Sequence, residues 1–153
     1  MGDGAMAVFG LDPPRGPSVA DRALAAAFAL AQRLFAQRLL MFPDAGLRCR
    51  IGLHVGPVTL SRMGADSHVQ LTITGDNVNL ASRLVEVAKA EQAVIVASEG
   101  FADGLTQVVA KQSARTATVE IRGRAGAVGV LAWDLDVIAD YDRLLAEQPS
   151  YQD

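Results

Sequence analysis

One stretch of this chain, residues 71–84, constrains the fold more than any other, because it has the pattern of a strand that turns directly into a helix. From Val69 to Thr74, apolar and polar residues alternate, which is the period of a strand with one buried face. Gly75 permits a tight turn, and Asp76 can cap the helix that follows. The sequence therefore predicts a strand–turn–helix unit around which the other elements pack.

The predicted helix presents two polar side chains together. Asn79 and Arg83 are one turn apart, so an amide and a guanidinium stand on the same face. We expect an apolar stripe beside them to pack against the rest of the molecule, formed by Val78, Ala81, Val85 and Ala88.

Residues 75–84, Gly-Asp-Asn-Val-Asn-Leu-Ala-Ser-Arg-Leu, resemble the signature of the class III adenylate/guanylate cyclase catalytic domain. Residues 50–58, Arg-Ile-Gly-Leu-His-Val-Gly-Pro-Val, resemble the strand that precedes it in that family. Two motifs in the family's order are far more specific than a single Gly-rich loop. The resemblance implies an α+β fold with the ferredoxin-like sheet of nucleotide cyclases, which agrees with the alternation of predicted strands and helices.

The resemblance extends over residues 1–135, the later part of a catalytic domain, and leaves residues 136–153 as a charged C-terminal tail. The family's first strand, with its second metal-binding aspartate, and the strand whose lysine pairs with the base-reading residue are expected before Gly2 and are not in this sequence. We therefore expect a cyclase fold that lacks its first strand region. An apolar sheet edge should then be exposed, and the chain should self-associate or pair to cover it.

The resemblance also assigns roles to single residues. Residues 2–10 resemble the segment that carries one of the two metal-binding aspartates, so Asp3 is the candidate ligand for Mg²⁺ or Mn²⁺; the alternative is an ordinary turn residue. Asn79 would orient the ribose. Arg83 would stabilise charge on the α-phosphoryl group, a role that suits a planar donor array that stays protonated.

Two further positions concern the substrate. Thr72 falls where the family reads the base, and a subgroup of adenylate cyclases that includes bicarbonate-responsive enzymes has threonine there. Its hydroxyl can accept a hydrogen bond from the adenine 6-amino group; the alternative is an ordinary strand threonine. Arg122 resembles a basic residue that contacts the terminal phosphates. Arg124 is a weaker candidate, and an exposed strand charge is the alternative reading of Arg122.

Composition excludes several other classes of function. The chain has 153 residues, enough for one domain with a real core, and half of them are hydrophobic. A net charge of −3 without a basic run gives no case for nucleic acid or an anionic membrane as a partner. Cys49 is the single cysteine, which fits a cytoplasmic setting and a small buried side chain. Ala23–Ala31 is too short to cross a bilayer, so no membrane contact is expected from this segment.

The remaining elements follow from periodicity and turn residues. Ser18, with Asp21 three residues later, should cap a helix that runs to about Leu40. A single histidine in a strand, His54, is expected to be a core or hydrogen-bonded residue. The other expected elements are strands at 5–9, 47–55, 57–63 and 93–97, a short helix at 98–105, and a closing hairpin of 119–124 and 128–135 with Trp133 on its packed face.

These observations favour an adenylate cyclase-type domain that converts ATP to cyclic AMP and pyrophosphate by metal-assisted attack of the ribose 3′-oxygen. In the family two domains meet head to tail, and this chain would need a second cyclase domain as its partner. The alternative is a non-catalytic cyclase-homology module that binds nucleotide or dimerises. A guanylate cyclase is disfavoured by Thr72.

Overall fold

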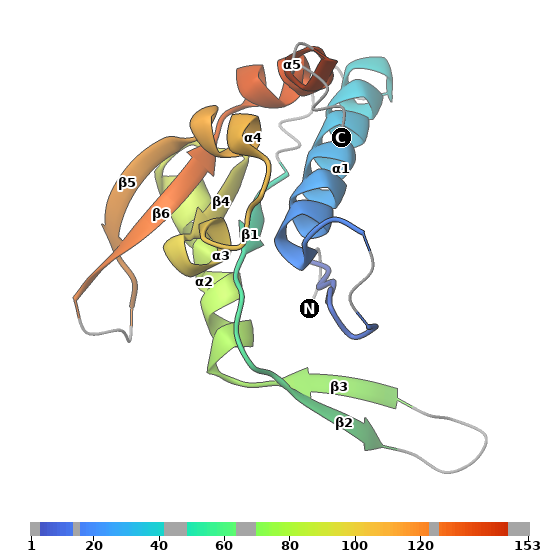
Figure 1. Ribbon diagram of the computed structural model, residues 1–153, viewed down its shortest axis with the longest axis vertical. Coiled ribbons are helices and arrows are strands. Elements are labelled where there is room, and N and C mark those ends of the chain that lie inside the picture. The colour runs from blue at the N-terminus through green and yellow to red at the C-terminus, as the bar shows by residue number, and fades with distance from the viewer. Residues whose placement is uncertain (1–3, 14–15, 42–48, 64–69, 123–125, 147–153) are drawn as a thin grey trace.

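The computed structural model describes residues 4–13, 16–41, 49–63, 70–122 and 126–146 (Figure 1). The helices are α1 (Val19–Met41), α2 (Asp76–Ala90), α3 (Glu99–Ala102), α4 (Val108–Gln112) and α5 (Leu135–Ala146). The strands are β1 (Ile51–Leu53), β2 (Thr59–Met63), β3 (Gln70–Thr74), β4 (Ile95–Ser98), β5 (Arg115–Glu120) and β6 (Ala127–Trp133).

Four strands form the main sheet in the order β1-β4-β6-β5. β1 runs parallel to β4, with Ile51 opposite Ile95, whereas β6 is antiparallel to both β4 and β5. β5 and β6 are the expected closing hairpin, although β5 begins four residues earlier than predicted. The mixed α+β architecture that the sequence predicted is confirmed.

The main sheet is covered on both faces, and β4 shows how. Ile95 and Ala97 belong to a core cluster with α1, α3, α4 and α5, while Val96 belongs to a second cluster with α2. Every residue of β4 is buried, which confirms the expectation of a fully buried strand. Helix α2 therefore has one face of the sheet largely to itself.

Helix α1 begins as the sequence predicted. The Ser18 hydroxyl accepts a hydrogen bond from the backbone N–H of Asp21, at 3.0 Å, and donates to its carboxylate. The helix ends at Met41, and the side chains of its apolar stripe are buried as far as Ala31. Phe28 from this stripe meets Trp133 edge to face, with ring centroids 6.1 Å apart. Trp133 is fully buried, as predicted for the packed face of the hairpin.

Strands β2 and β3 form a separate two-stranded sheet. Ser61 lies opposite Thr72 in this antiparallel hairpin. The hairpin extends away from the body of the molecule, below β1 and the start of α2 in Figure 1. Its position leaves Leu60 on β2 and the preceding Val58 exposed.

The strand expected at residues 5–9 is wrong, since these residues have no regular secondary structure. A strand needs a neighbour to satisfy its backbone, and no described strand pairs with this segment. Two of its apolar side chains, Met6 and Phe9, are exposed. β1, at the end of the sheet order, has β4 as its single strand neighbour among the described residues. β1 is therefore an edge strand whose residues are half-buried, and the exposed apolar sheet edge stays a prediction.

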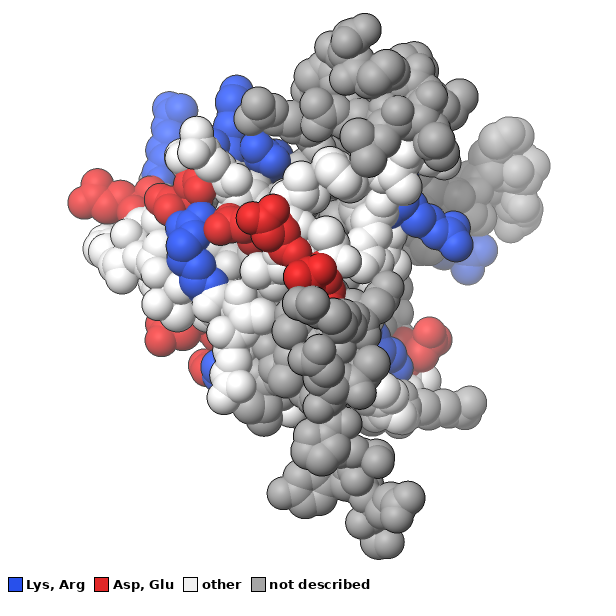
Figure 2. Space-filling model, turned by 90° about the horizontal axis from the view of Figure 1, so that it is seen from above, with Lys and Arg blue, Asp and Glu red and all other residues white. Residues whose placement is uncertain are grey.

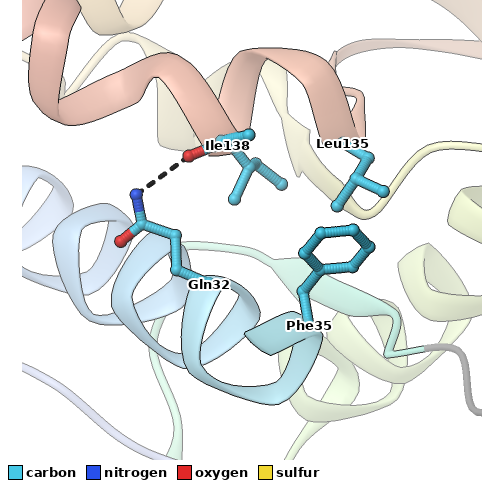
Figure 3. A pocket seen from close by; sticks show the side chains of 5 residues that line it. Gln32, Phe35, Leu135 and Ile138 are labelled. Carbon is cyan, nitrogen blue, oxygen red and sulfur yellow. Dashed lines mark hydrogen bonds between the residues drawn. The ribbon is translucent and has the colours of Figure 1, made fainter. Parts of the chain in front are cut away.

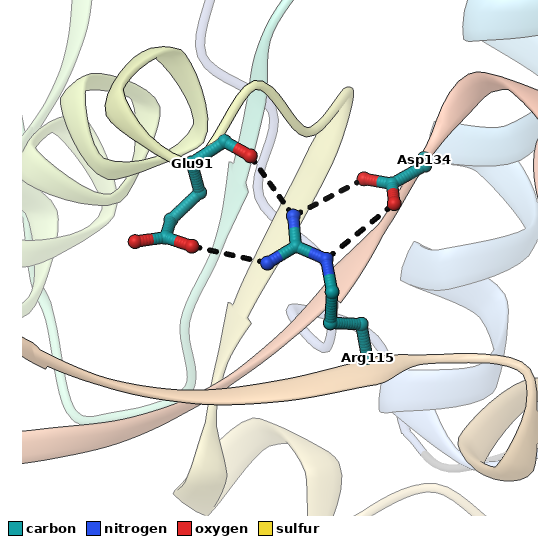
Figure 4. A network of polar contacts seen from close by, with 3 residues as sticks. All are labelled: Glu91, Arg115 and Asp134. Atoms are coloured by element: carbon teal, nitrogen blue, oxygen red, sulfur yellow. Dashed lines mark hydrogen bonds and ion pairs between the residues drawn. The ribbon is translucent and has the colours of Figure 1, made fainter.

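The C-terminal segment packs against the body. α5 begins at Leu135, and its Ile138 is fully buried in the core cluster of α1. At the junction between β6 and α5, the Arg115 guanidinium binds Asp134 and also the side chain and carbonyl of Glu91 at the end of α2 (Figure 4). One exposed arginine thus joins β5, α2 and the end of β6.

Two broader surface properties follow. On the face seen in Figure 2, acidic and basic side chains alternate and form no large patch of one sign. None of the described helices combines the length and the hydropathy that a bilayer crossing requires.

Candidate functional site

The site that the sequence predicted is organised by the start of α2. Gly75 is the N-cap, with a φ of 141° that side-chain-bearing residues rarely adopt, and its carbonyl accepts hydrogen bonds from the backbone N–H groups of Val78 and Asn79. The prediction that Asp76 caps the helix is wrong, because Asp76 is already the first helical residue and no side chain caps this end. Its negative charge in the first turn still suits the helix dipole.

Asn79 and Arg83 lie one turn apart on α2, as predicted. Asn79 is exposed and Arg83 half-buried, and neither side chain forms a hydrogen bond or ion pair with the part of the chain that the structure describes. An uncommitted amide and guanidinium are therefore available at the surface of this helix. Both groups suit the binding of a polar, anionic ligand.

The predicted apolar stripe of α2 is partly wrong. Its buried side chains are Leu80, Leu84, Val87 and Ala88, so only Ala88 of the predicted stripe is buried. Val85, predicted to face inward, is 36% exposed. Nearly all of these positions are aliphatic, so periodicity alone could not select the face that packs.

A glycine in β1 decides how closely α2 approaches the sheet. A Cβ atom on Gly52 would lie 2.3 Å from the carbonyl oxygen of Ala81 and 2.9 Å from Cβ of Leu84. Such distances are far inside van der Waals contact, so only glycine permits this approach. The backbone of α2 is thereby fixed on β1. Asn79 lies just before the residues that make this contact, and Arg83 lies among them.

The other predicted substrate residues lie on different elements. Thr72, half-buried, is in β3, immediately before the turn into α2. Arg122 is exposed and lies in the turn after β5, so its placement in a strand was wrong; β5 ends at Glu120. The neighbouring Ile121 is buried in the same cluster as Leu80 of α2, so this turn is on the α2 side of the sheet.

Two predicted site residues, Asp3 and Arg124, lie outside the described residues. Within the described ranges, no group of three or more His, Cys, Asp or Glu side chains is arranged to hold a metal ion. The Mg²⁺ or Mn²⁺ that the resemblance implies, with Asp3 as its candidate ligand, stays a prediction.

Sequence reasoning missed a polar network beside the start of α2. The ring of His54, directly after β1, has Nδ1 2.7 Å from the Ser98 hydroxyl and Nε2 3.0 Å from the side-chain oxygen of Asn77. The Asn77 amide nitrogen donates to the Pro57 carbonyl at 2.7 Å. The prediction that His54 is a hydrogen-bonded residue is confirmed. His54 and Asn77 each lie within one of the two motifs, at residues 50–58 and 75–84, so polar residues of the motifs were the signal that could have identified these partners.

Two other features, a pocket and the single cysteine, lie apart from the predicted site residues. An open pocket between α1 and α5 is lined by Gln32, Phe35, Leu135, Ile138 and Ala139, and Gln32 donates to the Ile138 carbonyl across it (Figure 3). No predicted site residue lines it. Burial raises the pKa of the half-buried Cys49 thiol, against a smaller opposing effect of Arg50. A raised pKa lowers the thiolate fraction, and the side chain that was predicted to be buried is half-buried.

Comparison with known proteins places this chain in a family. The model of the adenylate and guanylate cyclase catalytic domain matches residues 1–132 of the chain. Two relatives from Mycobacterium tuberculosis, uncharacterized proteins Rv1319c and Rv1318c, are 34% and 33% identical over 122 residues. Each alignment covers 80% of this chain, and the chain spans only about a fifth of the relatives' length, 22% and 21% respectively.

Solved structures show the same fold. A bacterial light-regulated adenylyl cyclase matches with a TM-score of 0.60 and 18% identity, over 79% of this chain and 38% of that one. The adenylyl cyclase CyaB from P. aeruginosa matches with a TM-score of 0.59 and 21% identity, over 81% of this chain and 63% of that one. The family match over most of the chain, together with this shared architecture, shows that the chain belongs to the adenylate and guanylate cyclase catalytic domain family.

Proposed function

We infer that this chain acts as an adenylate cyclase domain that contributes base-reading and transition-state residues to a site shared with a second cyclase domain. The observation that carries this proposal is the pair Asn79 and Arg83, uncommitted side chains one turn apart on a helix whose opposite face is fixed against the sheet. Positioned groups of this kind accelerate a reaction because their orientation is established before the substrate arrives.

The reaction is an intramolecular displacement in ATP. The ribose 3′-oxygen forms a bond to the α-phosphorus, the bond to the bridging oxygen of pyrophosphate breaks, and the 3′-hydroxyl proton is released. Arg83 would donate hydrogen bonds to the α-phosphoryl oxygens, where negative charge must be stabilised. Asn79 would hold the ribose so that its 3′-oxygen is aligned with the phosphorus.

Substrate choice is proposed to depend on Thr72. Its hydroxyl would accept a hydrogen bond from the 6-amino group of adenine, which favours ATP over GTP. Arg122 would contact the terminal phosphates from the turn after β5, where its exposed side chain is free to reach a ligand.

The metal ions are proposed to be held with carboxylates from the partner domain. Bound Mg²⁺ or Mn²⁺ would supply charge neutralisation for the phosphates and a lower pKa for the 3′-hydroxyl. Asp3 is the one candidate ligand named in this chain, and a single carboxylate does not hold a metal pair. This is the reason for proposing a second cyclase domain in head-to-tail arrangement as the partner.

The second candidate function is a non-catalytic cyclase-homology module that binds nucleotide or pairs with another domain. It is favoured by the same pair of side chains, because an amide and a guanidinium bind an anionic ligand whether or not a reaction follows. Asn79 and Arg83 would then recognise a nucleotide without turning it over.

Cyclic AMP formation from Mn-ATP separates the two functions. The chain is assayed alone and mixed with a complete cyclase domain whose own asparagine and arginine at the corresponding motif are replaced by alanine. We expect activity only in the mixture, and its loss with Arg83→Ala. Arg33→Ala removes an exposed arginine of α1 and is the matched control, expected to leave activity unchanged. Absence of product, with association shown by sedimentation, would favour the non-catalytic module, and a preference for GTP would refute the assignment to Thr72.

A further inference from the structure

The side chains around His54 form a chain of hydrogen bonds. In this chain, the donor or acceptor role of each group determines the role of the next. The Pro57 carbonyl can only accept, so the atom of Asn77 at 2.7 Å must be its NH₂ group. The Asn77 oxygen then faces His54 and can only accept. Nε2 of His54 must therefore carry the ring proton and donate it at 3.0 Å.

The same logic continues to Ser98. With the proton on Nε2, Nδ1 of neutral His54 is an acceptor, so the Ser98 hydroxyl donates to it at 2.7 Å. The Ser98 oxygen in turn accepts the backbone N–H of Phe101 and caps α3. Ser98 is 3% exposed, so its hydroxyl has little access to water as a substitute partner.

This network reaches the N-terminal end of α2, which has no side-chain cap. The Gly75 carbonyl closes the first turn by accepting from the N–H groups of Val78 and Asn79, and Asn77 lies in that turn. Asn77 is attached to the loop after β1 at two points, His54 and Pro57. A Cβ atom on Gly56 would lie 2.4 Å from Cγ of Asn77, so the Asn77 amide packs directly against the loop backbone at Gly56. Asn79 follows two residues after Asn77 on the same helix.

We propose that His54 is a positioning residue for the cyclase reaction, which holds Asn77 through its Nε2–H and thereby places the start of α2, with Asn79 two residues after Asn77 and Arg83 one turn beyond Asn79. The proposal rests on the proposed function for its catalytic consequence. The structural part of the proposal has two claims: Nε2 of His54 carries the ring proton, and the position of the first turn of α2 depends on this N–H. Both claims are argued from the hydrogen bonds alone. Gly52 fixes the middle of α2 on the sheet, and His54 fixes its beginning.

Two substitutions of His54 test the hydrogen bonds at Nε2 and at Nδ1 separately. His54→Gln places an amide NH₂ near the position of Nε2 and keeps the donor to Asn77. His54→Asn reaches only as far as Nδ1 and keeps a partner for Ser98 but loses the bond to Asn77. In the mixed assay we expect kcat to fall 10- to 100-fold in His54→Asn, with KM for Mn-ATP changed less than threefold, and His54→Gln to stay within about threefold of the unsubstituted chain. Ser82→Ala, at an exposed position of α2, is the control and should change neither constant.

NMR spectroscopy tests the structural part without any turnover. Ring ¹⁵N shifts should show His54 as the Nε2–H tautomer, with its signals separated from those of the other histidine by a His68→Gln variant. The Asn79 and Arg83 amide resonances should move in His54→Asn more than in His54→Gln, while those of Lys89 at the far end of α2 stay in place in both.

The outcomes are distinguishable. An Nδ1–H tautomer, or Asn79 and Arg83 resonances that respond equally to both variants, would overturn the proposal. Equal kcat losses in both variants would do the same, because only His54→Asn removes the donor to Asn77, so the losses would then reflect the missing ring and not that bond. If the unsubstituted mixture makes no cyclic AMP, the proposed function fails, and the NMR result still decides whether His54 positions the start of α2.

Discussion

The prediction that the structure supports in most detail concerns Asp21, a carboxylate that is 4% exposed. It accepts hydrogen bonds from the backbone N–H groups of Thr106 and Gln107, at 3.0 and 3.3 Å, and from the hydroxyls of Ser18 and Thr106. These donors join the start of α1 to the segment before α4, 85 residues later in the sequence. Replacing Asp21 should therefore loosen the packing of α1 on the sheet.

Two variants measure the contribution of the charge and of the hydrogen bonds. In Asp21→Asn, the amide oxygen can still accept from both backbone N–H groups, and the hydroxyls of Ser18 and Thr106 can rotate to accept from its NH₂ group. We expect a loss of about 1–2 kcal/mol in the free energy of unfolding, because charge-assisted bonds become neutral ones. Asp21→Ala removes every acceptor, and we expect it to cost about 3 kcal/mol.

The cost of Asp21→Asn should depend on pH. Burial by itself raises the pKa of Asp21, but the hydrogen bonds from the side chains of Thr106 and Ser18 and from the backbone of Thr106 and Gln107 outweigh it, so the pKa is lowered on folding. A carboxyl with a lowered pKa stabilises the fold fully above its unfolded value of about 3.9, and this contribution is lost as the pH falls through the folded value.

Urea unfolding at pH 7 and near pH 3, followed by the fluorescence of Trp133, checks this reasoning. Trp133 is the single tryptophan of the chain and is fully buried, so its emission reports loss of the core. The difference in stability between the unsubstituted chain and Asp21→Asn should shrink at the acidic end. A difference that stays constant with pH would show that the charge of Asp21 contributes nothing, and it would refute the argument.

Three further predictions follow from packing and exposure. Gly52→Ala should lower the unfolding free energy by about 1–3 kcal/mol, since its Cβ would overlap the Ala81 carbonyl; an unchanged melting temperature would contradict the close approach of α2. Arg115→Ala should cost less than about 1 kcal/mol, and less still at high salt, because the guanidinium and its partners are partly exposed; a loss of several kcal/mol in urea unfolding would refute this. Sedimentation should show self-association that covers the β1 edge and the exposed Met6 and Phe9, and a monodisperse monomer would count against it.

The sequence predicted local structure well where the signal is local. The Ser18–Asp21 capping pattern, the strand before Gly75 and the buried run at 93–97 each depend on neighbouring residues, and each appears in the fold. The single buried face expected for the strand before Gly75 was wrong, because Thr72 and Ile73 are both half-buried in a hairpin that pairs only with itself among the described residues. Capping at Asp76 failed because Gly75, with its positive φ, occupies the cap position and moves Asp76 into the helix. A one-residue difference of this kind is below what a pattern can resolve.

Long-range partners were not predictable from the same patterns. The residues that surround Asp21 come from a segment 85 positions away, and the strand at residues 5–9 depends on a neighbour that the described chain does not provide. The buried face of α2 was mistaken because it is set by the approach to Gly52, a contact across the fold. The candidate site followed the same rule: Asn79 and Arg83 were placed correctly on one helix, whereas His54 and Asn77 become partners only when β1 and α2 are packed together.

Arg83 and Thr72, the two parts of the proposed substrate site, lie on elements that are packed to different extents. Arg83 is on a helix packed against the main sheet, whereas Thr72 is on a hairpin whose strands pair only with each other among the described residues. An isolated two-stranded hairpin is marginally stable in water, so the position of Thr72 relative to Arg83 depends on whatever packs against the hairpin. In the proposed shared site that element is the partner domain. Selection of the base would then be a property of the pair of domains, while the placement of Arg83, the proposed transition-state residue, is already determined within this chain.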